Sequence, residues 1–129
     1  MNLTPEKVSE IEKSLVEMEL TDEGDKLIEA ERSDYYEKIL FMSSRTRGWC
    51  YYTEKVVAFV GGFGATRFSI PYNEIKKIEK CKVSFFPMGI KFWKYDEKKG
   101  KDVCYKIAAS HRKNILELLA SKVSPDVIG

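Results

Sequence analysis

The side chains that most often act as catalytic bases and nucleophiles are scarce in this sequence. His111 is the single histidine, so a histidine-based triad or metal site has no second member. Cys50, Cys81 and Cys104 lie too far apart for a Cys-x-x-Cys pair, and three cysteines cannot pair completely as disulfides. We therefore expect no catalytic residue, no metal site and no cofactor. His111 should face solvent at a helix start, and the cysteines should be reduced and mostly buried.

One segment, residues 61–64, has the glycine-rich composition of a phosphate-binding loop. Such a loop requires either a following Lys-Ser/Thr that opens a helix or a G-x-G-x-x-G pattern in a strand-to-helix turn. Here Thr66, Arg67 and Phe68 instead continue into a strand pattern. We interpret residues 61–64 as a hairpin turn that needs positive φ angles.

A cluster of basic residues could bind an anionic ligand. Lys38, Arg45 and Arg47 fall on a predicted strand and in the loop before the next one. Guanidinium groups hold phosphate oxygens through paired hydrogen bonds, so these three residues are the candidate ligand-binding residues. The alternative is a solvated hairpin without a ligand.

A second candidate surface combines cations with aromatic side chains at Lys91, Trp93, Lys94 and Tyr95. If Phe92 points into the core, strand alternation turns Trp93 outward together with Lys91 and Tyr95. An exposed Trp93 can insert among lipid headgroups, anchor a protein interface or stack on nucleobases. The alternative is that Trp93 packs under the N-terminal part of the chain.

Charge is distributed unevenly along the 129 residues, whose net charge is +2. Residues 1–34 carry four Lys/Arg against eleven Asp/Glu and so −7, which leaves +9 on residues 35–129. A basic domain favours anionic partners such as phosphorylated headgroups or acidic protein surfaces. Two solvated faces of opposite sign are the alternative interpretation.

The length suits one domain, and 43% hydrophobic residues suffice for a core. No apolar run approaches the length of a membrane span, and the N-terminus lacks the pattern of a signal peptide. With unpaired cysteines, these features predict a cytoplasmic protein, with peripheral membrane association as an open option.

The first 34 residues are predicted to form an acidic helical arm. Thr4 caps a helix that opens with Pro5, and its apolar stripe has helical spacing at Val8, Ile11, Leu15 and Met18. Residues 25–32 predict a second, shorter helix.

From residue 35 the period changes to short β-branched and aromatic runs separated by turn residues. Seven predicted strands fall at residues 39–42, 49–53, 56–60, 68–70, 83–86, 90–95 and 103–107. Residues 110–122 then predict an amphipathic helix capped by Ser110. The fold class is therefore α+β and mainly β, with residues 35–129 forming a closed or nearly closed antiparallel barrel of two sheets whose open end the helix plugs.

Two motifs within this region are distinctive in their order. Residues 48–59 contain Gly-Trp-x-Tyr-x-Thr-Glu-Lys-x-Val-x-Phe, residues 68–78 contain Phe-Ser-Ile-Pro-Tyr-x-x-Ile-x-x-Ile, and Gly89-Ile90 precede the final helix. This series resembles the GRAM and bacterial PH-like domains over residues 36–121. The resemblance implies a PH-like fold, a seven-stranded and partly orthogonal barrel capped by one helix. It also implies a role for the basic cluster, because the spacing of Lys38, Arg45 and Arg47 is similar to the phosphoinositide motif of PH domains.

We therefore expect a non-enzymatic PH-like module that meets an anionic membrane lipid or headgroup through its basic face. The alternative is a protein-interaction or self-association module that uses the aromatic residues of the later strands. Nucleic-acid binding ranks third, because no recognised motif accompanies the positive charge. We further expect the acidic arm to cover the basic face around Trp93 and to compete with an anionic ligand.

Overall fold

The computed structural model describes residues 2–39 and 42–129. Two α-helices flank seven strands in this described part, with short 3-10 turns at residues 62–64, 72–74 and 125–127. The elements are α1 (Pro5–Glu17), β1 (Leu27–Ile39), β2 (Met42–Thr53), β3 (Val56–Gly61), β4 (Thr66–Pro71), β5 (Ile75–Val83), β6 (Phe86–Asp96), β7 (Lys101–Ala108) and α2 (Arg112–Ala120).

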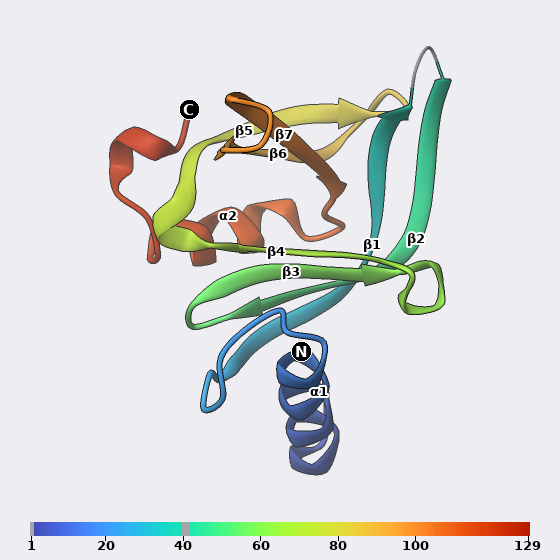
Figure 1. Cartoon of the computed structure of the whole chain (residues 1–129), viewed down its shortest axis with the longest axis vertical. Coiled ribbons are helices and arrows are strands. Elements are labelled where there is room, and N and C mark those ends of the chain that lie inside the picture. Colours follow the sequence, from blue (N-terminus) through green and yellow to red (C-terminus); the bar gives the residue numbers. More distant parts are fainter. Residues whose placement is uncertain (1, 40–41) are drawn as a thin grey trace.

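The strands form one antiparallel sheet in the order β4-β3-β2-β1-β7-β6-β5. Most neighbours pair over many residues, whereas β1 and β7 share only the pairs Tyr35 with Ile107 and Tyr36 with Lys106. The sheet bends sharply there, so that β1–β4 and β5–β7 face each other as two layers (Figure 1). This architecture confirms the predicted fold class of a mainly β, seven-stranded unit with a helix at each end.

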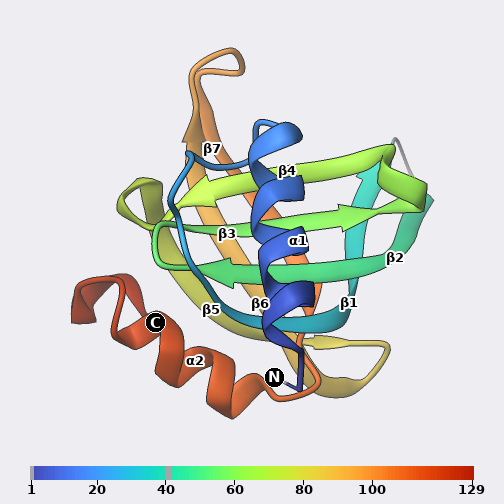
Figure 2. The same ribbon diagram turned by 90° about the horizontal axis from the view of Figure 1, so that it is seen from below.

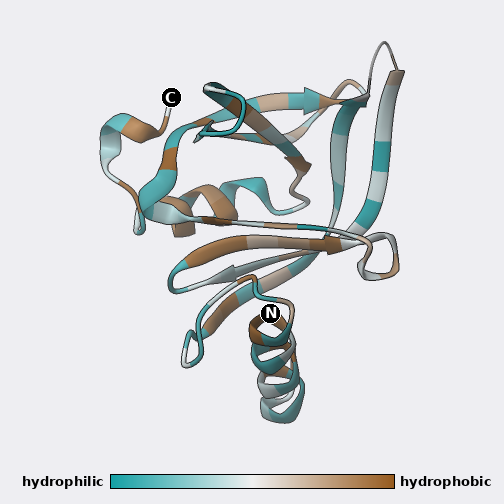
Figure 3. Ribbon diagram, in the orientation of Figure 1, coloured by the Kyte–Doolittle hydropathy of each residue, from teal (hydrophilic) through white to brown (hydrophobic). Residues whose placement is uncertain are grey.

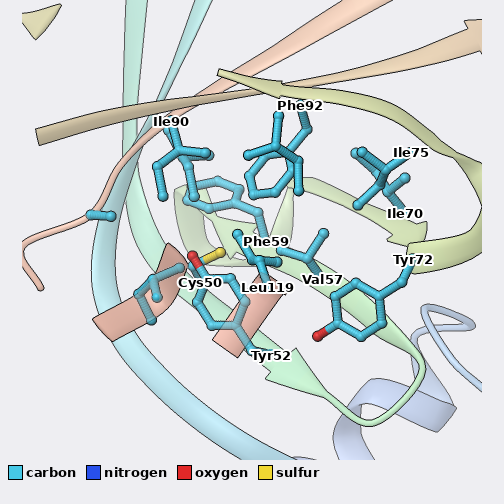
Figure 4. Close-up of a cluster of buried hydrophobic side chains, with 14 of the residues drawn as sticks. Cys50, Tyr52, Val57, Phe59, Ile70, Tyr72, Ile75, Ile90, Phe92 and Leu119 are labelled. Atoms are coloured by element: carbon cyan, nitrogen blue, oxygen red, sulfur yellow. The ribbon is translucent and has the colours of Figure 1, made fainter. Parts of the chain in front are cut away.

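The core fills the space between the two layers. Its largest side chains come from the inner faces of both layers and from α2, which lies across one end of that space (Figure 4). They include Tyr52, Phe59, Ile70, Ile90, Phe92, Ile115 and Leu119, each almost completely buried. The N-terminal helix α1 lies outside this core, on the far face of β2 and β3 (Figure 2).

Strand β3 is hydrophobic over most of its length (Figure 3), because both of its faces are buried. Val57 and Phe59 face the core, while Val56 and Ala58 face α1. Leu15 of α1 completes this second, smaller cluster. The predicted helix is confirmed, since Thr4 Oγ1 accepts a hydrogen bond from the Lys7 amide at 3.1 Å and Pro5 opens the first turn.

The predicted second helix at residues 25–32 is wrong, because this segment belongs largely to β1. Strand β1 pairs with β2 from Leu27 opposite Thr53 to Ile39 opposite Met42, so that one of its two edges is hydrogen-bonded along most of its length. The predicted boundary between residues 34 and 35 falls inside this strand. The division into an arm and a domain stays a prediction.

One of the seven predicted strand segments falls on a turn, since residues 83–86 contain the connection between β5 and β6. Another, residues 39–42, includes Leu40 and Phe41, which lie outside the described residues. The true fifth strand contains Ile75 and Ile78, both buried although they are three residues apart. A register shift between Ile75 and Lys77 makes this spacing possible within a strand.

Candidate anionic-ligand site

The β1–β2 hairpin gathers Lys38, Arg45 and Arg47 on one face. Directly opposed residues of an antiparallel pair point to the same side of the sheet. Lys38 opposes Ser43, Arg45 opposes Tyr36, and Arg47 opposes Asp34. The other face of β2 holds core residues such as Tyr52, so the three basic side chains occupy the outer face of the hairpin.

All three basic side chains are exposed. In the described part of the chain, none of the three forms a side-chain hydrogen bond or an ion pair. An exposed cation without a partner keeps its donors free for a ligand. The structure therefore brings together the three residues that the sequence selected, and the carboxylate nearest to them in the strand register is Asp34, opposite Arg47.

A pocket of about 320 Å³ opens where β1 and β7 pair so briefly. Its walls carry the basic side chains Arg32 and Arg47, the carboxylate of Asp34 and the hydroxyl-bearing Ser33 and Ser110; Met88 and Ala108 complete the lining. Ser33 Oγ is committed to the fold, since it donates to the Ala108 carbonyl at 2.6 Å. Arg45 shares the outer face but does not line this pocket.

Arg32 is a basic residue of this pocket that sequence reasoning missed. It was counted with the acidic N-terminal arm, whereas β1 places it opposite Trp49 and two residues from Asp34. A strand interpretation of residues 27–39 would have found it, because alternation puts residues 32, 34, 36 and 38 on one face.

The positive surface continues across the bend of the sheet. Tyr36 opposes Arg45 on one side and Lys106 on the other, and Lys106 in turn opposes Lys91. The ammonium of Lys106 lies 5.6 Å from the Tyr36 ring centroid, a cation–π distance. Three cations from β2, β7 and β6 thus lie in one row on the outer face, and Lys91 of the second candidate set belongs to this row.

The second candidate set divides between two faces of β6. Phe92 is buried, and Lys91, Trp93 and Tyr95 lie on the opposite face, as the alternation predicts. Lys94 instead shares the face of Phe92 and forms an ion pair of 3.2 Å with Glu74. The four residues do not form one continuous surface.

Trp93 is held by its own sheet. Its indole Nε1 donates to Glu79 Oε1 on β5 at 2.6 Å. Tyr95 is 46% exposed, and the Lys76 ammonium lies 5.3 Å from its ring centroid. Whether these side chains contact a partner stays a prediction.

The expected covering of Trp93 by the N-terminal arm is wrong. Helix α1 packs through Leu15 on Val56 and Ala58, on the outer side of β2 and β3. It borders Trp49 instead, with which it lines a groove of about 490 Å³. The physical reason is apolar matching, because Val56 and Ala58 offer an apolar outer surface on β3, whereas Trp93 lies among lysines.

Among the described residues, no hydrogen bond joins His111 to a cysteine. His111 is exposed, and its Nδ1 lies 3.3 Å from Glu31 Oε2. Burial raises the pKa of the Cys50 thiol to about 12, and burial also raises the pKa of Cys104. A thiol with a raised pKa carries little thiolate at neutral pH, and the thiolate is the nucleophilic form.

Across residues 2–39 and 42–129, no group of three or more His, Cys, Asp and Glu side chains is arranged to hold a metal ion. No helix of that same part of the chain is long and apolar enough to cross a membrane.

Comparison with known proteins finds likeness in structure alone. No protein-family model matches the sequence, and no curated protein matches it. Several solved structures resemble the chain, and three of them illustrate the likeness. The C-terminal domain of an unknown protein from Leishmania infantum has a TM-score of 0.63 and 20% identity, over 88% of this chain and 94% of that one.

The hSac2 domain of the human phosphoinositide phosphatase Sac2 has a TM-score of 0.57 at 12% identity, over 95% of this chain and 84% of that one. A pleckstrin homology domain from Shewanella amazonensis has a TM-score of 0.52 at 14% identity, over 95% and 92%. At these identities the likeness concerns the fold, and the finer resemblance to GRAM domains stays a prediction. The chain has a PH-like fold.

Proposed function

We propose that this chain is a non-enzymatic PH-like module that binds an anionic membrane surface through the outer face of its β1–β2 hairpin. One observation carries the proposal: Lys38, Arg45 and Arg47 share that face, are exposed and have no partner in the described chain. Arg47 also shares a pocket with Arg32. Two guanidinium groups at one pocket suit the oxygens of a phosphate group.

The wider charge distribution supports this orientation. Residues 35–129 carry +9, and the row of Arg45, Lys106 and Lys91 extends the positive surface beyond the hairpin. The acidic helix α1 packs on β2 and β3 rather than across this row. A basic residue close to an anionic membrane contributes about 1 kcal/mol, so several acting together give useful affinity.

The absence of enzymatic activity is part of the proposal. Its support is that burial raises the pKa of both Cys50 and Cys104, while His111 contacts a carboxylate rather than a thiol. One structural neighbour is a domain of a phosphoinositide phosphatase, which makes phosphoinositides the first headgroup to test.

The test is co-sedimentation of the full chain with vesicles of phosphatidylcholine, alone or mixed with phosphatidylserine or a phosphoinositide. We expect binding to the anionic vesicles and a decline as salt screens the charges. The double variant Arg45→Ala with Arg47→Ala should bind about thirtyfold more weakly, at about 1 kcal/mol for each arginine.

The matched control is Lys98→Ala with Lys99→Ala, which removes the same charge from the exposed β6–β7 turn. It should bind almost as well as the parent chain. If both double variants lose the same affinity, net charge alone drives binding and the hairpin site is incorrect. If only the lysine variant loses affinity, the site lies near β6 and β7.

A further inference from the structure

Large apolar side chains stand exposed at the start of β2 and around two hairpin turns. Met42 begins β2 and is 75% exposed, and Phe63 in the β3–β4 turn is fully exposed. Phe85 lies in the β5–β6 turn and is 95% exposed, and Phe86 begins β6 and is 63% exposed. We call these four residues the apolar tips. Scattered exposed apolar residues are ordinary, whereas their concentration at three ends of strands is not.

The start of β2 and the β3–β4 and β5–β6 turns lie on one side of the molecule. Figures 1 and 2 share their horizontal axis, and along it all three lie at the right. The apolar tips therefore form three separate points on that side, rather than a continuous patch.

The backbone holds two of the aromatic residues in conformations that cost free energy. Phe63 has φ 58° between Gly62 and Gly64, and Phe85 has φ 70° after Ser84 at 47°. Turns with positive φ strongly prefer glycine and asparagine, and a bulky residue there costs about 1 kcal/mol or more. The strain and the exposure both oppose placing a phenylalanine at these points if water is its only neighbour.

Cations surround the apolar tips. The segments 38–47, 61–67 and 80–86 contain no carboxylate, and the acidic residues that adjoin them are Glu37 before the first and Glu79 before the third. Six exposed basic residues lie within these segments: Lys38, Arg45, Arg47, Arg67, Lys80 and Lys82. Apolar side chains flanked by Lys and Arg are the composition that binds the interface of an anionic bilayer.

We propose that the apolar tips insert into the boundary between the headgroups and acyl chains of an anionic bilayer, and so orient the domain on the membrane. This inference rests on the proposed function and adds an apolar anchor to its electrostatic contact. A second copy of the chain is a poorer occupant, because a stable protein interface needs about 800 Å² of continuous surface per partner. A fluid bilayer accommodates three separate points.

The test removes the rings without changing charge. Asparagine tolerates positive φ, so Phe63→Asn with Phe85→Asn keeps both turns while deleting their aromatic rings. Binding to vesicles of phosphatidylcholine and phosphatidylserine should fall about tenfold for each ring. Tyr95→Asn, which removes an exposed ring from β6, is the matched control and should bind as the parent does.

Salt separates this inference from the proposed function. The double variant Phe63→Asn with Phe85→Asn, called the ring variant, should lose the part of the binding that persists at high salt. The variant Arg45→Ala with Arg47→Ala should lose the part that is sensitive to salt. Unchanged binding of the ring variant, with weakened binding of the arginine variant, would overturn insertion and leave the proposed function intact. Failure of the parent chain to bind anionic vesicles at any salt concentration would overturn both.

Depth is measured directly with Phe85→Trp and lipids brominated on their acyl chains. The fluorescence of the native Trp49 and Trp93, measured in the parent chain, is subtracted as background. Quenching of the remaining fluorescence, which comes from the tryptophan at position 85, by the brominated lipids supports insertion. An unquenched tryptophan at position 85 overturns it. So does a dimer in sedimentation that the ring variant dissociates, because a second copy would then cover the tips.

Discussion

Replacing Leu15 by alanine tests how α1 is held on the sheet. Leu15 is 1% exposed and packs with Leu20 of the following turn and with Val56 and Ala58 of β3. Its neighbours are fixed by a helix on one side and a sheet on the other, so they can close only part of the space that the variant would leave. Leu→Ala at such buried positions costs about 3 to 5 kcal/mol.

We expect Leu15→Ala to lower the free energy of unfolding by about 3 kcal/mol, the lower end of that range, because α1 lies at the periphery and can shift. Urea denaturation followed by circular dichroism measures the loss. Ser14→Ala, an exposed neighbour on the same helix, is the control and should change the stability by less than about 0.5 kcal/mol. Equal stability of Leu15→Ala and the parent would refute the docking of α1 on β3.

Two further predictions concern β1 and β2. Burial raises the pKa of the Glu31 carboxyl against the opposing effect of His111, and Glu31 Oε1 has no hydrogen-bond partner in the described structure. The folded state therefore holds the Glu31 proton more tightly than the unfolded state does, so this group's stabilising contribution is complete at low pH and is lost as pH rises through the folded pKa. Glu31→Gln should raise the free energy of unfolding at pH 7 but not near pH 3, and an equal effect at both values in urea titrations would contradict this. Gly48→Ala should destabilise the chain by several kcal/mol, on the order of 3 or more, because the new Cβ would lie 2.2 Å from the Val60 carbonyl oxygen. Thermal unfolding checks it, and a melting temperature within about 2 °C of the parent would show that the strands separate there at little cost.

The mainly β, antiparallel fold, the strands at residues 49–53, 56–60, 68–70, 90–95 and 103–107 and the helices α1 and α2 followed from the sequence, because alternating apolar residues between turn signals are a local pattern. Gly48 shows where local reasoning stopped. It reads as a turn residue, yet it lies within β2, because the backbone of Val60 on β3 passes too close for any side chain. Such a constraint arises between strands and leaves no trace in the neighbouring residues.

The first strand was missed for a related reason. Residues 27–39 are rich in charge, and Leu27, Ile28 and Ala30 have spacing that also suits a short helix. Pairing with β2 over its full length outweighs the local preference. That error also hid Arg32, whose position beside the Arg47 pocket depends on the strand register and on the narrow contact between β1 and β7.

The residues of the candidate site could be selected from the sequence because Lys38, Arg45 and Arg47 lie on one hairpin, where the alternation of side chains between the two faces is a local pattern. The separation of Lys94 from Lys91, Trp93 and Tyr95 follows from the same alternation, although the sequence alone grouped all four. The place where α1 packs could not be predicted from the sequence, because its apolar stripe fits any exposed apolar strand face.

The most direct test of the central claim is to map which backbone amides of the full chain meet a membrane. Nuclear magnetic resonance spectra would be recorded with nanodiscs of phosphatidylcholine, with and without phosphatidylserine. We predict that the anionic nanodiscs selectively broaden the signals of residues 34–38 and 43–47, on the outer face of the β1–β2 hairpin. Broadening centred on Trp93 and Tyr95, with the hairpin unchanged, would contradict the proposed function.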